Sequence, residues 1–196
     1  MSKTIDYYNT KAKDFFDNTF NVDMQSLYDA FCRYLPVSGK ILDVGCGSGR
    51  DALYFSKLGY DVEAIDYSPE LVKLARKNTG LDIQLASFYD IHEQDRYAGI
   101  WACASLLHCE RDRLPEVIQK LINALENNGI CYLSFKYGDQ TSEKEGRTFT
   151  DLNEAQSAEL FNHFDNILIL QQWITVDKRP DRTEEWLNII FRKIEG

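Results

Sequence analysis

The chain reads Ile41-Leu42-Asp43-Val44-Gly45-Cys46-Gly47-Ser48-Gly49 where an apolar run breaks into three glycines at alternate positions. An amphipathic segment follows at once, from Arg50 to Leu58. This order predicts a strand, a tight turn and a helix. Glycine reaches positive φ at little cost and lets a ligand approach the backbone, and the helix N-terminus offers free N–H groups. The turn therefore suits a nucleotide-like ligand.

The spacing of these glycines narrows the ligand class. A dinucleotide fold prefers G-x-G-x-x-G, and no Lys-Ser or Lys-Thr follows, which excludes a phosphate-binding P-loop. The pattern Asp43-x-Gly45-x-Gly47-x-Gly49 resembles motif I of the class I S-adenosylmethionine-dependent methyltransferases. The resemblance implies that the glycines pack under the methionine and ribose of the cofactor, and that Asp43 helps to hold its amino group. A strand–helix turn without a ligand is the alternative.

Later segments extend the resemblance over residues 40–136. Asp66 ends the second predicted strand, where a carboxylate accepts both ribose hydroxyls through strong charge-assisted bonds. Asp66-Tyr67-Ser68-Pro69-Glu70 resembles the D-x-S-x-E segment of the family, and Gly99–His108 resembles its motif IV. Ser87 stands where the family often has Asp, and Phe88 is a candidate cover for the adenine or a core residue. The implied cofactor contacts are Asp43, Gly45, Cys46, Gly47, Gly49, Asp66, Tyr67, Ser87, Phe88 and Ala104; Cys46 is also interpreted as a small residue that fits the turn.

Helical and strand patterns alternate after residue 40, which predicts a Rossmann-like three-layer α/β sandwich. The expected sheet has seven strands, mostly parallel, and closes with an antiparallel hairpin. Residues 1–196 are expected to form one methyltransferase domain, with a helical cap at 1–36 and a Rossmann-like core at 37–196. The pattern also predicts a helix stop at 127–129, a mobile loop at 136–149, a capping box of Asp151 with Glu154, and a link between the last strands at 177–182.

Composition excludes several classes of protein. The 196 residues are 44% apolar, enough for a core, and the net charge of −9 argues against broad nucleic-acid binding. The five cysteines include no C-x-x-C pair, so neither a disulfide framework nor a metal site is expected. No apolar segment approaches the roughly 20 residues of a membrane span, and the N-terminus lacks a signal-peptide core. A cytoplasmic monomer or homodimer is the expectation.

Three residues are the catalytic candidates. His108 follows strand four on the rim where open α/β sheets hold ligands, and its ordinary pKa lies near neutrality, so it is the first candidate base. A histidine packed in that turn is an equal alternative. Tyr8, in the predicted cap, is a candidate hydrogen-bond donor to the cofactor carboxylate or the substrate. Lys136, with Tyr137 and Arg147, forms a candidate rim for an anionic substrate group, and a solvated loop is the alternative.

The predicted function is methyl transfer from S-adenosylmethionine to a small molecule by in-line displacement. The family resemblance includes bacterial members similar to tellurite-resistance methyltransferases. One alternative is a methyltransferase for tRNA or a protein side chain. Another is a non-catalytic cofactor-binding partner subunit, which a blocked acceptor pocket would favour. The tRNA or protein alternative requires folding to gather a basic cluster from Lys136, Lys144, Arg147, Lys178, Arg179 and Arg182.

Overall fold

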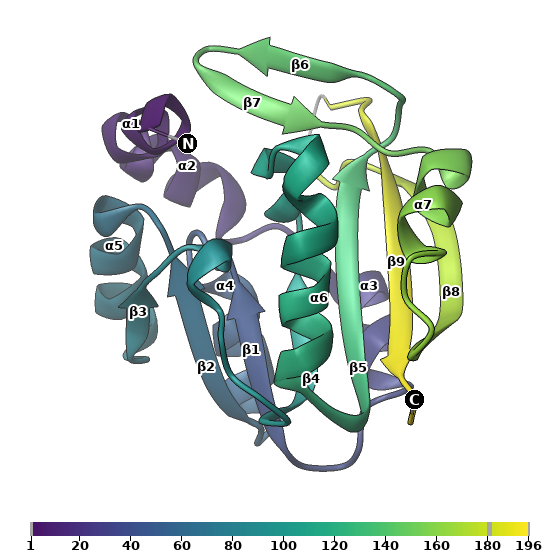
Figure 1. Cartoon of the computed structure of the whole chain (residues 1–196). Coiled ribbons are helices and arrows are strands. Elements are labelled where there is room, and N and C mark those ends of the chain that lie inside the picture. Colours follow the sequence, from purple (N-terminus) through teal and green to yellow (C-terminus); the bar gives the residue numbers. More distant parts are fainter. Residues whose placement is uncertain (1, 180–181, 196) are drawn as a thin grey trace.

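A computed structural model of the protein describes residues 2–179 and 182–195, and a seven-stranded sheet forms its centre (Figure 1). The first five strands of the sheet order pair in parallel, and the last three pair antiparallel. This confirms the predicted mostly parallel sheet with a closing hairpin. In spatial order the strands are β3 (Ile83–Leu85), β2 (Asp61–Asp66), β1 (Lys40–Val44), β4 (Tyr97–Ala102), β5 (Leu125–Lys136), β9 (Glu185–Lys193) and β8 (Ile167–Val176).

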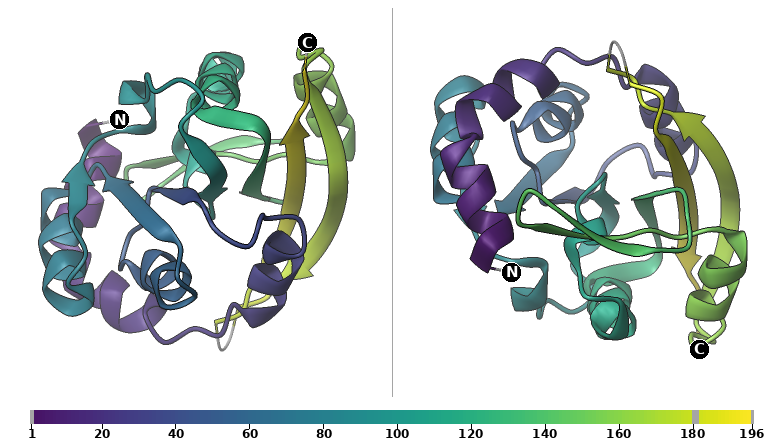
Figure 2. Two further views of the ribbon diagram at one scale, coloured as in Figure 1. Left: turned by 90° about the horizontal axis from the view of Figure 1, so that it is seen from below. Right: turned by 90° about the horizontal axis from the view of Figure 1, so that it is seen from above.

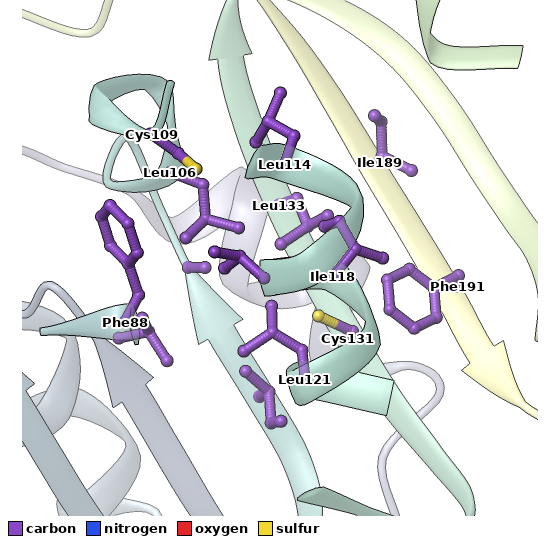
Figure 3. Close-up of a cluster of buried hydrophobic side chains, with 14 of the residues drawn as sticks. Phe88, Leu106, Cys109, Leu114, Ile118, Leu121, Cys131, Leu133, Ile189 and Phe191 are labelled. Carbon is purple, nitrogen blue, oxygen red and sulfur yellow. The ribbon is translucent and has the colours of Figure 1, made fainter. Parts of the chain in front are cut away.

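Helices cover both faces of the sheet, as the alternating pattern predicts. On one face α6 (Leu114–Ala124) and α7 (Glu154–Phe161) pack against buried side chains of β5 and β9, and Figure 3 shows Leu121 and Leu133 in this cluster. On the other face α3 (Gln25–Cys32) and α4 (Arg50–Lys57) pack on Trp101 and Tyr132. Because successive strand residues point to opposite faces, neighbouring residues Tyr132 and Leu133 serve different layers.

The helix that follows β2 begins and ends as its sequence predicts. The Ser68 hydroxyl accepts a hydrogen bond from the Leu71 N–H at 3.3 Å, and Pro69 is the first residue of α5 (Pro69–Thr79). Gly80 ends the helix with φ +74°, in the left-handed region that glycine favours. These local signals fix the end of β2, where Asp66 lies.

The expectation of a mobile loop at 136–149 is wrong, because this segment forms a hairpin. Strands β6 (Thr141–Lys144) and β7 (Arg147–Thr150) pair antiparallel around Glu145 and Gly146, which have φ of +53° and +78°. Two consecutive residues with positive φ match the twist of the flanking strands. The polar composition concealed this turn, although the Glu145-Gly146 dipeptide is a usable signal for it.

Two helix boundaries also differ from the expectation. Asn153 and Gln156 form the capping box of α7, in place of Asp151 and Glu154. The Asp151 N–H donates to the backbone carbonyl of Gln140, which holds residue 151 in an extended segment before the helix begins. Residues 127–129 do not stop α6, which ends at 124 because Leu125 already has extended backbone angles and begins β5.

The carboxyl ends of the parallel strands are covered by segments from distant parts of the chain. Figure 2, seen from above, shows the β6–β7 hairpin crossing this end between the N-terminal helices and β8–β9. The N-terminal helices are α1 (Ser2–Thr10) and α2 (Ala12–Thr19); short 3₁₀ helices lie at η1 (Phe88–Asp90), η2 (Leu106–His108) and η3 (Arg111–Arg113). Pro180 and Asp181 of the predicted link lie outside the described residues. No helix among the described residues has the length and apolar character needed to cross a bilayer.

Candidate active site

Two cavities meet at the carboxyl end of the sheet. A small one of about 80 Å³ lies over the end of β2, and a large one of about 840 Å³ extends toward β5, β9 and the β6–β7 hairpin. Open α/β sheets hold their ligands at this edge. The residues that line both cavities are Tyr8, Phe15, Gly45, Gly47, Ala104 and His108.

The glycine turn separates the two cavities and is packed so closely that side chains would not fit. A Cβ on Gly45 would lie 2.5 Å from the Cβ of Ser105, and one on Gly47 would lie 2.9 Å from the Phe15 ring. Both glycines have positive φ, of +71° and +55°. The turn therefore presents bare backbone to both cavities, which is the arrangement that a bound nucleoside requires. Gly49, with φ +78°, begins α4 against Thr79 and lines neither cavity.

Asp66 connects the glycine turn to the end of β2. Its Oδ2 accepts a hydrogen bond from the Gly47 N–H at 2.8 Å, and its Oδ1 accepts one from the Ser68 N–H at 2.8 Å. Burial raises the pKa of this carboxyl, and the backbone N–H donors oppose that shift. The side chain lines the small cavity. Each oxygen keeps a free lone pair, so the carboxylate can accept further hydroxyl donors from a ligand.

Asp43 lies beneath the turn and lines neither cavity, so the structure does not give it the direct ligand position that the family resemblance implies. Its side chain is buried, and its Oδ2 has no hydrogen-bond partner among the described residues. Burial raises the pKa of Asp43 well above its usual range, and the neighbouring Asp51 carboxylate raises it further. Asp43 thus belongs to the support of the turn.

The remaining predicted cofactor contacts surround the two cavities. Ser87 lines the small one, but its hydroxyl accepts a hydrogen bond from the Tyr89 N–H at 3.1 Å and caps η1. Phe88 is 8% exposed, packs in the core and also lines the same cavity. Ala104 has φ +51°, an uncommon angle that its N–H bond to the Ser134 hydroxyl at 2.8 Å helps to maintain. Tyr67 lines the small cavity and is largely exposed, and Cys46 lines the large one.

Tyr8 and His108, which are 100 residues apart in the chain, form a hydrogen-bonded pair at the junction of the cavities. The Tyr8 hydroxyl lies 2.8 Å from Nε2 of His108, and Nδ1 lies 2.7 Å from the carbonyl oxygen of Thr148. A carbonyl only accepts, so Nδ1 carries the ring proton and Nε2 accepts from the Tyr8 hydroxyl. The contacts thus define a neutral imidazole of fixed tautomer.

The surroundings keep both members of this pair uncharged. Burial lowers the pKa of His108 to about 4, and the cations Arg147 and Lys136 add to the effect. Burial raises the pKa of Tyr8 to about 12, although Arg147 opposes that shift. At neutral pH the site therefore holds a phenol that donates to an imidazole.

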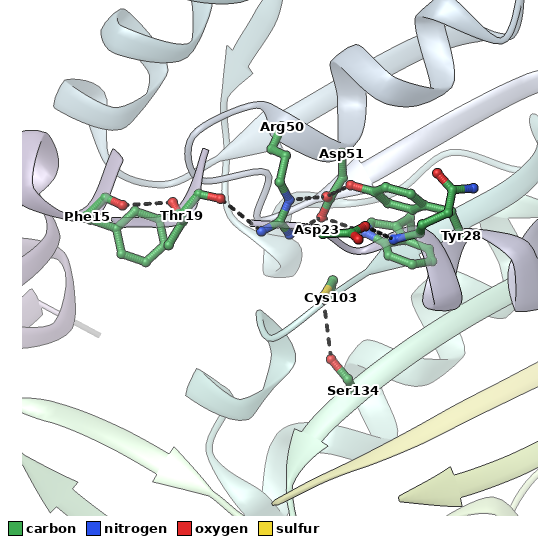
Figure 4. A network of polar contacts seen from close by, with 10 residues as sticks. Phe15, Thr19, Asp23, Tyr28, Arg50, Asp51, Cys103 and Ser134 are labelled. Carbon is green, nitrogen blue, oxygen red and sulfur yellow. Dashed lines mark hydrogen bonds and ion pairs between the residues drawn. The ribbon is translucent and has the colours of Figure 1, made fainter. Parts of the chain in front are cut away.

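A buried ion pair holds the cap against the glycine turn. Nε of Arg50 donates to Asp51 at 2.6 Å, and Nη1 donates to the Thr19 carbonyl at the end of α2 at 3.1 Å (Figure 4). Tyr28 and Trp101 also donate to Asp51, at 2.5 and 2.9 Å. The Arg50 guanidinium is thus held by partners within the protein. The network fixes α2, which carries Phe15 over Gly47.

All six predicted basic residues line the large cavity, so folding does gather the cluster that the tRNA or protein alternative requires. Three of them pair with carboxylates: Arg147 with Glu145, Arg179 with Asp177, and Arg182 with Glu184. Tyr137 is not part of this rim, since it lines neither cavity and its hydroxyl donates to Glu154 at 2.9 Å.

Sequence reasoning missed two residues with clear roles in the cavities. Ser105 lies within the segment that resembles motif IV, lines the small cavity, and has a buried hydroxyl without a partner among the described residues. Phe149 lies on β7, and the centre of its ring is 5.0 Å from the centre of the His108 ring. Ser105 could have been predicted, because it follows the candidate contact Ala104 directly in the sequence. Phe149 could not, because its segment was interpreted as a loop.

Comparison with known proteins identifies several methyltransferases among the relatives of this chain. Residues 41–129 match a family described as a methyltransferase domain. The chain is 23% identical to an uncharacterized methyltransferase of Staphylococcus carnosus, covering 90% of this chain and 94% of that protein. It is 31% identical over 126 residues to the probable S-adenosyl-L-methionine-dependent methyltransferase TehB of Haemophilus influenzae, covering 60% of this chain and 43% of that protein.

A solved structure shows the same fold over nearly the whole chain. The 1,6-didemethyltoxoflavin-N1-methyltransferase of Burkholderia thailandensis superposes with a TM-score of 0.78 at 20% identity, covering 99% of this chain and 87% of that one. The sheet order and this superposition thus define a Rossmann-like fold of the methyltransferase type. The domain match and the relatives make the chain similar to the class I S-adenosylmethionine-dependent methyltransferases, TehB among them, and support S-adenosylmethionine as its cofactor.

Proposed function

We propose that this methyltransferase acts on a small organic acceptor held in the large cavity. The observation that carries the proposal is that the Gly45–Gly47 turn forms a wall of both cavities, so a cofactor lying on the turn faces the acceptor space. The Burkholderia structure holds a small molecule, 1,6-didemethyltoxoflavin, together with S-adenosylhomocysteine. A net charge of −9 also favours a small molecule over a nucleic acid.

The residues around the small cavity fit the nucleoside part of the cofactor. The turn leaves a cradle that a Cβ would fill, and the buried Ser105 hydroxyl has an unused donor. We assign the ribose hydroxyls to Asp66 and the adenine to the wall formed by Phe88 and Ser87, with Tyr67, Ala104 and Cys46 around them. In this proposal residues 1–36 act as the cap of a single domain with the core at 37–196, and the cap contributes Tyr8.

Methyl transfer requires alignment above all, because S-adenosylmethionine supplies a methyl group already activated on a sulfonium. An acceptor O–H or N–H must also lose a proton. We assign this step to the Tyr8–His108 pair: the Tyr8 oxygen takes the acceptor proton while its own proton passes to Nε2 of His108. The contacts of the pair leave lone pairs of the phenol oxygen available to the acceptor. Lys136, on the wall of the acceptor cavity, is assigned to substrate binding.

Two other functions fit the cavities less well. A non-catalytic partner subunit is disfavoured, since the acceptor cavity is about 840 Å³ and thus not blocked. A methyltransferase for tRNA or a protein side chain is supported by the gathered basic residues. Their pairing with three carboxylates and their place around a cavity argue for a compact ligand.

Calorimetry tests the cofactor assignment, and turnover measurements test the proton relay. S-adenosylmethionine and S-adenosylhomocysteine should bind, and NAD should give no heat. In a panel of small O–H and N–H acceptors, Tyr8→Phe should lower turnover at least tenfold while S-adenosylhomocysteine affinity changes less than threefold, because a lost proton relay affects chemistry alone. NAD binding in place of S-adenosylhomocysteine would overturn the cofactor assignment, and full turnover by Tyr8→Phe would overturn the relay.

A further inference from the structure

Two cations bracket the same aromatic ring in the large cavity. Nζ of Lys136 lies 4.2 Å from the centre of the Phe149 ring, and the guanidinium carbon of Arg147 lies 5.2 Å from it. Arg147 also stacks on Tyr7, at 3.8 Å from the ring centre. The cations come from β5 and β7, so only the hairpin that covers the sheet edge brings them together.

The charges of this pair are only partly neutralised by the protein. Lys136 makes no ion pair with a carboxylate within the described ranges. Burial lowers its pKa, the nearby Asp151 and Glu184 carboxylates oppose that shift, and Lys144 and Arg147 add to it. Arg147 pairs through one terminal nitrogen with the exposed Glu145 at 2.8 Å, and its buried Nε has no partner among the described residues. A guanidinium can bind an anion through two neighbouring N–H groups at once. The unused Nε–H is one donor available for such a bidentate contact.

The position of the pair connects it to the proposed chemistry. Phe149 packs on His108, and Tyr8 lies 6.0 Å from the Arg147 guanidinium, measured to the ring centre. Lys136 and Arg147 line the same cavity as the Tyr8–His108 pair. An anionic group bound between the two cations would therefore place the rest of its molecule beside the proposed proton relay.

We propose that the methyl acceptor carries a carboxylate or phosphate group, which Lys136 and Arg147 bind against the Phe149 ring. The inference rests on the proposed function, since it names the class of molecule that enters the acceptor cavity. Apolar and aromatic side chains on the cavity wall provide contact for an organic body attached to the anion. These are Tyr7, Leu107, Phe149 and Trp186.

A compact anion fits these charges better than a polynucleotide does. RNA recognition without sequence preference requires a track of several unpaired cations on an open surface. Here Arg179 and Arg182 are paired with acidic neighbours, and the chain as a whole is acidic. Lys136 and the unused Nε–H of Arg147 lie against the same Phe149 ring inside the cavity, which suits one anionic group.

The test uses two probes of the same shape that differ in charge. Binding of 2-naphthoate and of 2-naphthamide to the full chain, saturated with S-adenosylhomocysteine, is measured by calorimetry at low and high salt. The carboxylate should bind at least tenfold more tightly, and Lys136→Gln or Arg147→Lys should each reduce that preference at least fivefold. Lys77→Gln, at an exposed position on α5 far from the cavity lining, is the matched control and should retain the preference.

The outcomes distinguish a failure of the anion site from a failure of the proposed function. Failure of the wild-type chain to bind S-adenosylhomocysteine would overturn the proposed function. If that ligand binds but the two probes bind equally, or if both variants keep the carboxylate preference, only the anion site is wrong. Tight, salt-sensitive binding of bulk tRNA with no naphthoate preference would replace the small anion by RNA. Retained S-adenosylhomocysteine affinity in each variant shows that it is folded.

Discussion

Replacing His108 by glutamine should remove a defined part of the acid sensitivity of this fold. The pKa of His108 is lowered from 6.5 to about 4 in the folded chain, chiefly by burial. Well above pH 6.5 the ring is neutral in both states and adds no pH dependence to the free energy of unfolding. As the pH falls from 6.5 toward 4, the unfolded chain takes up a proton that the folded chain does not, so the free energy of unfolding decreases.

The size of this effect follows from the two pKa values. At about 1.4 kcal/mol per pKa unit, the full difference corresponds to about 3 kcal/mol, reached near pH 4. Between pH 7.5 and 5.0 about 2 kcal/mol of it develops, and partial exposure of the ring reduces the expected loss to about 1–2 kcal/mol. The variant lacks the titrating ring, so the gap between wild type and His108→Gln should change by this amount over that pH range.

Urea unfolding followed by tryptophan fluorescence measures the gap at each pH. Any pH-independent cost of the substitution cancels, because only the change in the gap is compared. His163→Gln, at an exposed position, is the matched control and should leave the pH profile unchanged. A gap for His108→Gln that stays constant within about 0.5 kcal/mol would refute the burial of a neutral imidazole and, with it, the assigned tautomer.

The remaining predictions concern the cofactor side of the site. Asp66→Asn should weaken S-adenosylhomocysteine binding about tenfold to a hundredfold in calorimetry, because hydrogen bonds to a charged acceptor are lost. The substitution Asp82→Asn, at an exposed position, is its control. Equal affinity of Asp66→Asn and the wild type for S-adenosylhomocysteine would contradict the ribose assignment. Gly47→Ala should cost about 1–2 kcal/mol in urea unfolding from its positive φ, and should also reduce cofactor affinity because the new Cβ meets Phe15. Gly80→Ala has a similar φ with open space around it, so it should cost stability alone; a matching loss of affinity there would show that the effect is global.

The cofactor side of the site was largely predictable because its determinants are local in sequence. One contiguous segment supplies β1, the glycine turn and α4, and the parallel pairing of β1 with β2 brings Asp66 to the same edge. Right-handed crossovers make that outcome nearly obligatory once the alternation of elements is recognised. Asp43 is the exception: its place in the motif was clear, but only burial showed that it lies beneath the cavities.

The acceptor side could not be predicted to the same depth. The sequence named Tyr8 and His108 separately and grouped Lys136 with Arg147 only as a rim, and the interpretation of 136–149 as a mobile loop hid the hairpin that brings these residues together. Thr148 on that hairpin fixes the tautomer of His108, a detail that no local pattern encodes.

The sequence by itself determined the fold class and the methyl donor, because hydrophobic periodicity and the glycine spacing act through neighbouring residues. Only the tertiary structure decided which groups face the acceptor. The Tyr8–His108 contact joins α1 to η2, and the β6–β7 hairpin brings Arg147 beside Lys136. Such contacts depend on how distant segments pack over one sheet edge, and burial there, more than residue type, fixes their charge states.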